Sequence, residues 1–256
     1  MANQPEIIAE AVAQYTVAGI LAVSRQLVAS HKVTWEWDIE GWPDHLVGRL
    51  VTGRSLGLLG AGRIGQAVAV KLRALGVGDI YYYSRSRKPC LEASLSARKV
   101  GLEELFINSE ILVNSLPLTP ETRELVTSSL LSLLPYGAIY VNVGRGGTEK
   151  PGAVARVAKR RKDLGFFLDV HPHEPLTIRD ERLLMADGAR VILSPHRAGY
   201  SKESLYGTSL LALLQAKDFI EKGCVWNPVN TACRQCEWGP PFIGEVIKAL
   251  RGLGLL

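Results

Sequence analysis

The sequence predicts an α/β fold, a doubly wound parallel β-sheet with long flanking helices near the two ends of the chain. From Ser55 onward, short apolar runs alternate with helix-like segments. Strands joined by helical connections pair in parallel with right-handed crossovers, which builds a sheet covered on both faces. A glycine-rich loop, Gly60–Gly65, stands between the first apolar run and the first of these helices. We expect a central domain at residues 51–200, preceded by a helix and an aromatic loop at residues 1–50 and followed by a return helix and a cysteine-containing tail at residues 201–256.

The N-terminal segment Ile7–Ser30 is rich in Ala, Val, Ile and Leu, which predicts one long helix. Glu10, Gln14 and Arg25 interrupt it, and no uncharged run approaches the ~18 residues typical of a membrane span. We therefore expect a helix buried on one or more faces and no membrane association. The first ten residues contain no Lys or Arg, so no signal peptide is expected and the expected location is cytoplasmic. The stretch Trp35–Pro43 reads as an aromatic loop that packs.

The alternating segments give the expected elements of the sheet in order. The expected strands are Ser55–Leu59, Ile80–Tyr83, Ile111–Ser115, Ala138–Val143, Gly165–Leu168 and Val191–Leu193. The helical segments between them are Gln66–Leu75, Leu102–Leu105, Ser128–Leu134, Ala153–Arg161 and a short acid-bearing stretch near Arg179–Met185. Lys202–Lys222 then reads as one long helix, and a terminal helix is expected at Ile243–Leu250 after Pro228.

Composition and charge exclude several classes of function. The 256 residues are 47% hydrophobic and 21% charged, with a net charge of +5 spread along the chain. A diffuse basic excess is usually a solvated surface, so nucleic-acid binding is not expected. Cys233 and Cys236 form a C-x-x-C pair near Cys224, but neither a second pair nor a nearby His completes a zinc site. We expect no metal, and a tail disulfide or two free thiols instead.

The glycine loop predicts a dinucleotide site of the Rossmann type. It follows the apolar run Leu56–Leu59 directly and opens a segment whose apolar residues fall on one helical face. In that setting Gly60 allows the tight turn, Gly62 lets the backbone approach a pyrophosphate, and Gly65 lets the helix pack on the strand. The phosphates would then meet free N–H groups and the positive end of the helix dipole. The alternative is a glycine-rich turn that binds no ligand.

The end of the second strand indicates which dinucleotide is preferred. Ser84 lies nineteen residues beyond Gly65, where an NAD site usually has Asp or Glu, and Arg85, Arg87 and Lys88 follow. A carboxylate there would repel a 2′-phosphate, whereas Ser and Arg can bind one. We therefore predict that NADP(H) is preferred, with NAD(H) possible. The alternative is that these basic residues form only a solvated turn.

Five motifs together resemble the D-isomer-specific 2-hydroxyacid dehydrogenase family, in its glyoxylate or hydroxypyruvate reductase-like branch. They stand in the family's order and spacing, and the resemblance covers nearly everything from Ile8 to about Asn230. The motifs are Gly60–Gly65, Leu116–Thr122, Val141–Gly147, Asp169–Leu176 and Ser194–Gly199.

The resemblance implies a catalytic set of Arg145, Glu174 and His196. Arg145 would bind the substrate carboxylate, His196 would give a proton to the carbonyl oxygen as hydride arrives, and Glu174 would hold the protonated imidazole. Taken singly, each residue also has an alternative interpretation without catalysis. Arg145 would be a loop cation, Glu174 a surface acid and His196 a buried histidine.

The family pattern also implies further cofactor residues and shows departures. The implied cofactor contacts beyond Ser84, Arg85 and Arg87 are Gly60, Gly62, Arg63, Ile64, Gly65, Leu116, Pro117, Thr122, Val143, Gly144, Asp169 and Gly199. His171 and His173 stand where the family more often has an aromatic residue and an acid, and two loop positions give too few ligands for a metal. Arg197 adds a positive charge beside His196, where an apolar residue is more common.

Members of this family usually begin with a smaller substrate domain, most of which is lacking here before the first long helix. We expect hydride transfer between NADP(H) and a small 2-keto or 2-hydroxy acid such as glyoxylate or hydroxypyruvate, incomplete without that domain. The alternatives are a non-catalytic NADP(H) sensor and a remnant that only dimerises. The resemblance implies a homodimer, and a separate substrate-domain polypeptide is a further candidate partner.

Overall fold

The computed structural model describes residues 5–35, 44–175, 190–225, 234–235 and 243–256. It divides the chain into two compact units. One unit is formed by residues 13–198, and the other by residues 1–12 together with residues 199–256.

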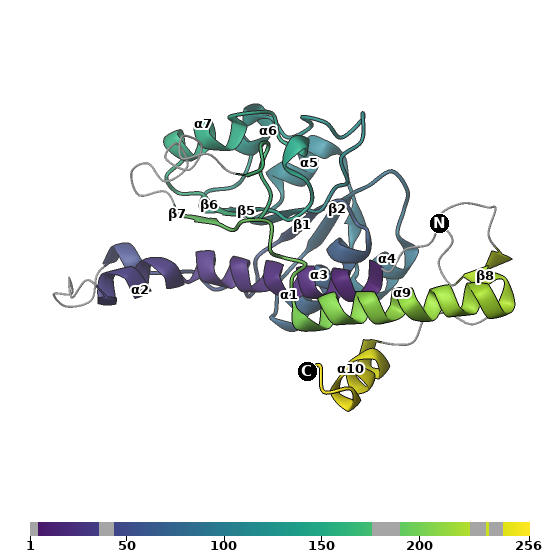
Figure 1. The fold of residues 1–256 in the computed structure, drawn as a ribbon. Coiled ribbons are helices and arrows are strands. Elements are labelled where there is room, and N and C mark those ends of the chain that lie inside the picture. The colour runs from purple at the N-terminus through teal and green to yellow at the C-terminus, as the bar shows by residue number, and fades with distance from the viewer. Residues whose placement is uncertain (1–4, 36–43, 176–189, 226–233, 236–242) are drawn as a thin grey trace. The chain divides into compact units, whose positions relative to one another are not determined.

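The larger unit is built on one seven-stranded sheet, which confirms the expected doubly wound α/β fold (Figure 1). Every neighbouring pair of its strands is parallel, and the spatial order is β3-β2-β1-β4-β5-β6-β7. The strands are β1 Leu56–Leu59, β2 Ile80–Tyr83, β3 Arg98–Lys99, β4 Ile111–Asn114, β5 Ile139–Asn142, β6 Gly165–Leu168 and β7 Arg190–Leu193. Because β4 returns to the other side of β1, the direction of winding reverses between these two strands, which is where such sheets bind ligands.

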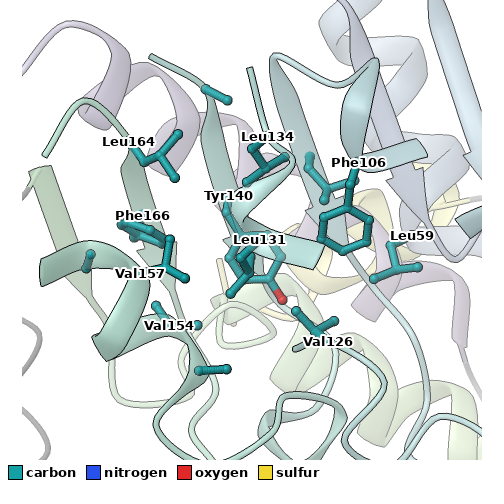
Figure 2. Close-up of a cluster of buried hydrophobic side chains, with 14 of the residues drawn as sticks. Leu59, Phe106, Val126, Leu131, Leu134, Tyr140, Val154, Val157, Leu164 and Phe166 are labelled. Atoms are coloured by element: carbon teal, nitrogen blue, oxygen red, sulfur yellow. The ribbon is translucent and has the colours of Figure 1, made fainter. Parts of the chain in front are cut away.

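One face of the sheet is covered by three short helices, α5 Leu102–Ile107, α6 Ser128–Ser132 and α7 Ala153–Arg160. Their apolar residues and those of the strands form a continuous buried cluster (Figure 2). Tyr140 lies within it, with its ring edge-on to Phe166 at a centroid distance of 6.4 Å. Its hydroxyl is the polar atom that this apolar cluster must accommodate, because a buried hydroxyl needs hydrogen-bond partners.

The opposite face is covered by α3 Arg63–Ala74 and by the second half of α1 Pro5–Ser24. Successive strand side chains point to opposite faces, so Phe167 faces away from the cluster that contains Phe166. A Cβ on Gly19 would lie 2.2 Å from the Phe167 ring, and a Cβ on Gly165 would lie 2.4 Å from Val23 Cγ1. The helix therefore approaches β6 closely enough that each surface needs a glycine at one point.

The α1 helix is also the one helix among the described residues that is long and apolar enough to cross a membrane, over Ile7–Ser24. Half of that window is buried inside the structure. Its contacts with Phe167 and Gly165 in the larger unit are those of a core helix, which passes the same test of length and composition.

In the larger unit, the helices and strands differ from the expected ones in three main places. The helix expected at Ile7–Ser30 is two helices, because Gln26 adopts a left-handed φ of 52° between α1 and α2 Leu27–Trp35. The helix α4 Pro89–Leu95 and the edge strand β3 were not expected. Most of the aromatic loop and the stretch Arg179–Met185 lie outside the described residues.

The smaller unit contains the long helix expected at Lys202–Lys222, which is α9 with the same bounds, and α10 Ile243–Gly252. Ile7, Leu211, Cys224, Val246 and Leu250 form its buried cluster. The short strands β8 Cys224–Val225 and β9 Arg234–Gln235 pair in parallel. Cys224 is disulfide-bonded, Cys90 is free and exposed, and Cys233 and Cys236 lie outside the described residues.

Candidate active site

The expected site residues of the larger unit follow the carboxyl ends of parallel strands. The loops after β1, β2, β4, β5, β6 and β7 begin at Gly60, Ser84, Ser115, Val143, Asp169 and Ser194. Strands that run parallel present these ends at one edge of the sheet, so the structure gathers the six loops there. Gly199 begins the other unit and is not placed relative to this edge.

The glycine loop has the backbone that the sequence predicts. Gly60 has a φ of +97°, which a residue with a side chain rarely adopts, and its N–H donates to the Tyr83 carbonyl at 3.0 Å. A Cβ on Gly65 would lie 2.4 Å from the Gly60 carbonyl oxygen, so this position needs a glycine for α3 to pack against the loop. Ser115 Oγ donates to the same oxygen at 2.9 Å and ties the loop to the end of β4.

Gly62 and the start of α3 fit a pyrophosphate. Gly62 is the N-cap of α3, and it has no side chain that could form a capping hydrogen bond to the first turn. No atom lies within 4 Å of where a Cβ on Gly62 would stand. The open space lies beside a helix N-terminus whose dipole favours negative charge, as an N-terminal phosphate site requires. Arg63 and Ile64 are the first two residues of this helix.

At the end of β2, the structure separates the two arginines that the sequence grouped together. Arg87 forms two hydrogen bonds to the Glu92 carboxylate, at 2.7 and 3.2 Å, and Glu92 also accepts from the Tyr82 hydroxyl. Arg85 is exposed and lies close enough to Glu121 to help lower the pKa of that carboxyl, after the larger effects of Thr119 and the Glu121 backbone N–H. Ser84 Oγ donates to the Ser86 carbonyl at 2.6 Å. The guanidinium of Arg85 is therefore the better placed of the two to meet a phosphate.

The loops after β4 and β5 lie backbone against backbone. A Cβ on Gly144 would lie 2.6 Å from the Leu116 carbonyl oxygen. Thr122 Oγ1 donates to the Pro117 carbonyl at 2.6 Å and accepts from the Thr119 N–H at 2.8 Å, which closes the turn at Leu116–Thr122. Val143 and Leu116 are buried at this edge, so they supply apolar surface beside the glycine loop.

Arg145 follows β5 and is exposed. It caps a short 3-10 turn, Gly146–Thr148, and its Nη1 donates to the Gly144 carbonyl at 2.7 Å. A Cβ on Gly146 would lie 1.9 Å from the His171 carbonyl carbon and oxygen, so a glycine is required where the loop after β5 crosses the loop after β6.

The loop that carries His196 is fixed by Asp169. The Asp169 carboxylate accepts from the backbone N–H groups of Arg197 and Ala198, at 2.8 and 2.9 Å. The Asp169 carbonyl accepts from the His196 N–H at 2.8 Å. These three bonds hold His196 at a left-handed φ of 55°, an uncommon backbone conformation for a residue with a side chain.

His196 and Glu174 form the central pair of the site. Nδ1–H of His196 donates to Glu174 Oε2 at 2.9 Å, and Glu174 Oε1 accepts from the His171 N–H at 3.0 Å. Partial burial tends to raise the pKa of Glu174, but the hydrogen bonds from His196 and His171 outweigh it, so the pKa is lowered and the carboxylate is ionised. This arrangement leaves His196 Nε2 without a hydrogen bond to the described residues and available to a substrate.

His171, an unexpected residue in the sequence, has a structural role. It is buried, and its Nε2–H donates to the Ser194 carbonyl at 2.9 Å, which joins the ends of β6 and β7. Within the described residues, no group of three or more His, Cys, Asp or Glu side chains is arranged to hold a metal.

Beneath Arg145 the structure places a buried polar network that sequence reasoning missed. Glu149 is 3% exposed, and its Oε1 accepts from the Tyr140 hydroxyl at 3.0 Å and from Asn142 Nδ2 at 2.8 Å. Burial raises the pKa of Glu149 to about 7, against the lowering effect of these two donors. The available signal was a pair of Asn residues, Asn114 and Asn142, each at the end of an otherwise apolar run.

A comparison with models of known protein families identifies the family to which the chain belongs. Residues 17–198 match the model of the D-isomer specific 2-hydroxyacid dehydrogenase NAD-binding domain. The chain belongs to this family. Its members' NAD-binding domain is thus the larger unit seen here, from the second half of α1 to the loop that carries His196.

Individual relatives agree with this assignment. The chain is 38% identical over 233 residues to a glyoxylate reductase of Aeropyrum pernix, covering 89% of this chain and 68% of that protein. It is 37% identical over 199 residues to a glyoxylate reductase of Thermococcus kodakarensis, covering 76% of this chain and 58% of that protein. The chain therefore spans about three fifths to two thirds of the length of these two relatives.

Solved structures show the same architecture. The TT0316 protein from Thermus thermophilus superposes with a TM-score of 0.79 at 31% identity, over 90% of this chain and 71% of that one. A glyoxylate reductase from Paecilomyes thermophila superposes with a TM-score of 0.78 at 27% identity, over 89% of this chain and 67% of that one.

Proposed function

We propose that this dehydrogenase transfers a hydride between NADP(H) and a small 2-keto or 2-hydroxy acid, with glyoxylate and hydroxypyruvate as the first substrates to test. The observation that carries the proposal is the 2.9 Å hydrogen bond between His196 and Glu174 at the sheet edge that also holds Arg145 and the glycine loop. A protein that only senses a dinucleotide has no use for a proton donor and a carboxylate-binding arginine together. The glyoxylate reductases among its relatives support the same substrate class.

In the direction of reduction, a reduced nicotinamide held beside these loops would supply a hydride for the carbonyl carbon of the keto acid. Arg145 binds the substrate carboxylate through paired N–H donors, which orients that carbonyl. His196 transfers the proton on Nε2 to the carbonyl oxygen, where negative charge develops, and the product is the 2-hydroxy acid. Glu174 accepts from Nδ1–H throughout, so it fixes the imidazole and stabilises its protonated form.

The test is to follow NADPH absorbance with a panel of 2-keto acids for the wild type and for His196→Ala. Loss of the proton donor should lower kcat by roughly 100- to 10,000-fold, the usual contribution of general acid catalysis. His31→Ala removes an exposed imidazole on α2 and should leave turnover unchanged. Tight NADPH binding without turnover of any keto acid by the wild type would instead identify a cofactor sensor.

The preference for NADP(H) is supported by the end of β2. Ser84 offers a hydroxyl where a carboxylate would repel a 2′-phosphate, and Arg85 is exposed beside it while Arg87 is bound to Glu92. We expect Arg85→Ala to raise KM for NADPH by roughly 10- to 100-fold, the effect of losing one charge-assisted interaction, with little change in KM for NADH. Arg87→Ala is the comparison, and a smaller effect is expected there. Equal KM values for the two cofactors in the wild type would contradict the preference.

We also expect a homodimer that acts in the cytoplasm. Exposed apolar residues on α9, among them Leu213, Phe219 and Ile220, supply surface that a second copy would cover. Sedimentation velocity of the purified chain measures the oligomeric state, and a monomer at micromolar concentration would contradict the expectation.

A further inference from the structure

The proposed reaction does not explain the network of hydrogen-bonded polar side chains that is buried beneath the loop after β5. Asn114 and Asn142 are the last residues of β4 and β5 and are partners in the sheet register. Each uses its side-chain oxygen in the same way, since Asn114 Oδ1 accepts from the Leu116 N–H and Asn142 Oδ1 accepts from the Gly144 N–H, both at 3.1 Å. The two side chains therefore shape the loops that flank the dinucleotide site.

The side-chain amides of the same two residues point the network toward Arg145. Asn114 Nδ2 donates to the Tyr140 hydroxyl at 3.1 Å and to Thr148 Oγ1 at 2.9 Å. Thr148 Oγ1 in turn donates to the Arg145 carbonyl at 2.7 Å, and the Thr148 N–H donates to the same oxygen at 3.1 Å. The backbone of Arg145 is thus fixed by Thr148, which the network orients.

Glu149 is the acceptor on which the network ends. The Tyr140 hydroxyl accepts a hydrogen bond from Asn114 and donates one to Glu149 Oε1. Asn142 Nδ2 donates to the same oxygen. A buried donor that loses its acceptor destabilises the fold by more than the hydrogen bond itself contributes to stability. The Tyr140 hydroxyl and the Asn142 amide therefore both depend on Glu149. A carboxyl in this position makes the direction of every hydrogen bond in the network unambiguous.

We propose that Glu149 is a positioning residue for Arg145. Through Tyr140, Asn142, Asn114 and Thr148 it holds the Arg145 carbonyl, and with it the origin of the guanidinium that binds the substrate carboxylate. The inference rests on the proposed function, because it needs Arg145 to be that binding group. It assigns a buried acid outside the Arg145, Glu174 and His196 set to the control of substrate binding.

The protonation state of Glu149 gives this role a pH dependence. The carboxyl is buried, and no ion pair joins it to a cation among the described residues. Both donors approach Oε1, which leaves Oε2 to carry the proton at low pH. Among the described residues, the groups that act on this carboxyl are the Tyr140 hydroxyl and the neutral Asn142 amide, and the basic residues next to it in sequence, Arg145 and Lys150, are exposed. Ionisation near pH 7 adds a buried negative charge to the network, and we expect this charge to weaken the hold of the network on the Arg145 loop.

The test uses the full chain with saturating NADPH and oxamate, an unreactive analogue of a 2-keto acid. Glu149→Val removes the acceptor and should raise the Kd for oxamate at least 10-fold, while the Kd for NADPH changes less than 3-fold. Glu149→Gln keeps an acceptor for Tyr140 and Asn142, so it should bind oxamate within 3-fold of the wild type at pH 6. Between pH 6 and 8 the wild type should lose affinity that Glu149→Gln retains, because the two proteins differ only at residue 149. Glu103→Gln, the same change at an exposed site on α5, is the control.

A second measurement does not depend on ligand binding and covers the case in which Glu149→Val fails to fold. The backbone amide signals of Gly144 and Arg145 in the free protein should titrate with a midpoint near pH 7, and Glu149→Gln should abolish that titration. Wild-type affinity in Glu149→Val, or amide signals that titrate identically in Glu149→Gln, would overturn the inference. If Arg145→Lys binds oxamate as the wild type does, or if the wild type does not bind it, the proposed function fails and takes this inference with it.

Discussion

At the scale of single residues, the site depends on side chains whose partners fix their chemistry. Arg145 is exposed at the end of β5, while its backbone is held by Thr148 from below. A guanidinium offers two parallel donors to a carboxylate, whereas an ammonium offers a point charge.

We therefore expect Arg145→Lys to raise KM for the keto acid by roughly 10- to 100-fold, because one charge-assisted hydrogen bond is lost. KM for NADPH should change little, since the glycine loop is untouched. Initial rates over a matrix of the two substrate concentrations separate the two constants. An unchanged KM for the keto acid would place carboxylate binding elsewhere.

Glu149 predicts a pH dependence of stability with a defined sign. Its pKa is raised from 4.5 to about 7, so between these pH values the folded protein holds a proton that the unfolded chain has released. Its contribution to stability is therefore full below pH 4.5 and is lost as pH rises to 7, by roughly 3 kcal/mol.

The measurement is urea unfolding at pH 5, 6, 7 and 8 for the wild type and Glu149→Gln. The free energy of unfolding of the variant should fall less over this range than that of the wild type. Parallel curves for the two proteins would show that Glu149 has an ordinary pKa.

At the scale of elements, α1 and β6 pack closely because each has a glycine opposite a large side chain of the other. Gly19 faces Phe167, and Val23 faces Gly165. Replacing a glycine with alanine inside a helix usually stabilises it by about 1 kcal/mol.

Gly19→Ala is expected to do the opposite, because the new Cβ would lie 2.2 Å from the Phe167 ring and the core must shift. Overpacking of this kind costs about 1–3 kcal/mol, so the melting temperature should fall. Gly244→Ala in α10, where no atom lies within 4 Å of the new Cβ, is the matched control and should not lower it. A stabilised Gly19→Ala would mean that α1 does not pack on β6.

The elements also show how far sequence reasoning extends. The strands from β1 to β7, other than β3, were predicted within one or two residues, because buried parallel strands are continuous apolar runs. The strand β3 consists of Arg98 and Lys99, both exposed, and carries no apolar signal. The break at Gln26 was missed because neither glycine nor proline marks it.

The candidate site likewise contains residues that the sequence predicted and one residue that it did not. The glycine loop and the pairing of His196 with Glu174 were predicted, the first from its local pattern and the second from the family resemblance. Glu149 was missed because an acid between Thr148 and Lys150 reads as a solvated loop residue. Its burial follows from the pairing of its segment with Val126, which is remote in sequence and invisible to local patterns.

At the scale of the whole molecule, cofactor binding should stabilise the larger unit. A ligand present at 100 times its Kd adds about 2.7 kcal/mol, which for a unit of this size raises the melting temperature by roughly 5 to 10 °C. Thermal unfolding with and without NADPH measures the shift.

Gly62→Ala separates binding from folding in the same experiment. The space around Gly62 is open, so the variant should melt without ligand at the wild-type temperature. The added methyl occupies the approach of the pyrophosphate, so the NADPH-dependent shift should be lost. A wild-type shift in this variant would place the phosphates elsewhere.

The packing of α1 on β6 has a consequence for the order in which the protein is made. Gly19 and Phe167 are in contact although 148 positions separate them (167 − 19). During synthesis the apolar second half of α1 leaves the ribosome long before β6 exists to receive it. The contact between Gly19 and Phe167 can therefore form only late in the synthesis of the chain. Until then, an exposed apolar helix can bind chaperones or other nascent chains, so α1, which is made before the strand it packs on, should be among the last elements to reach its native contacts.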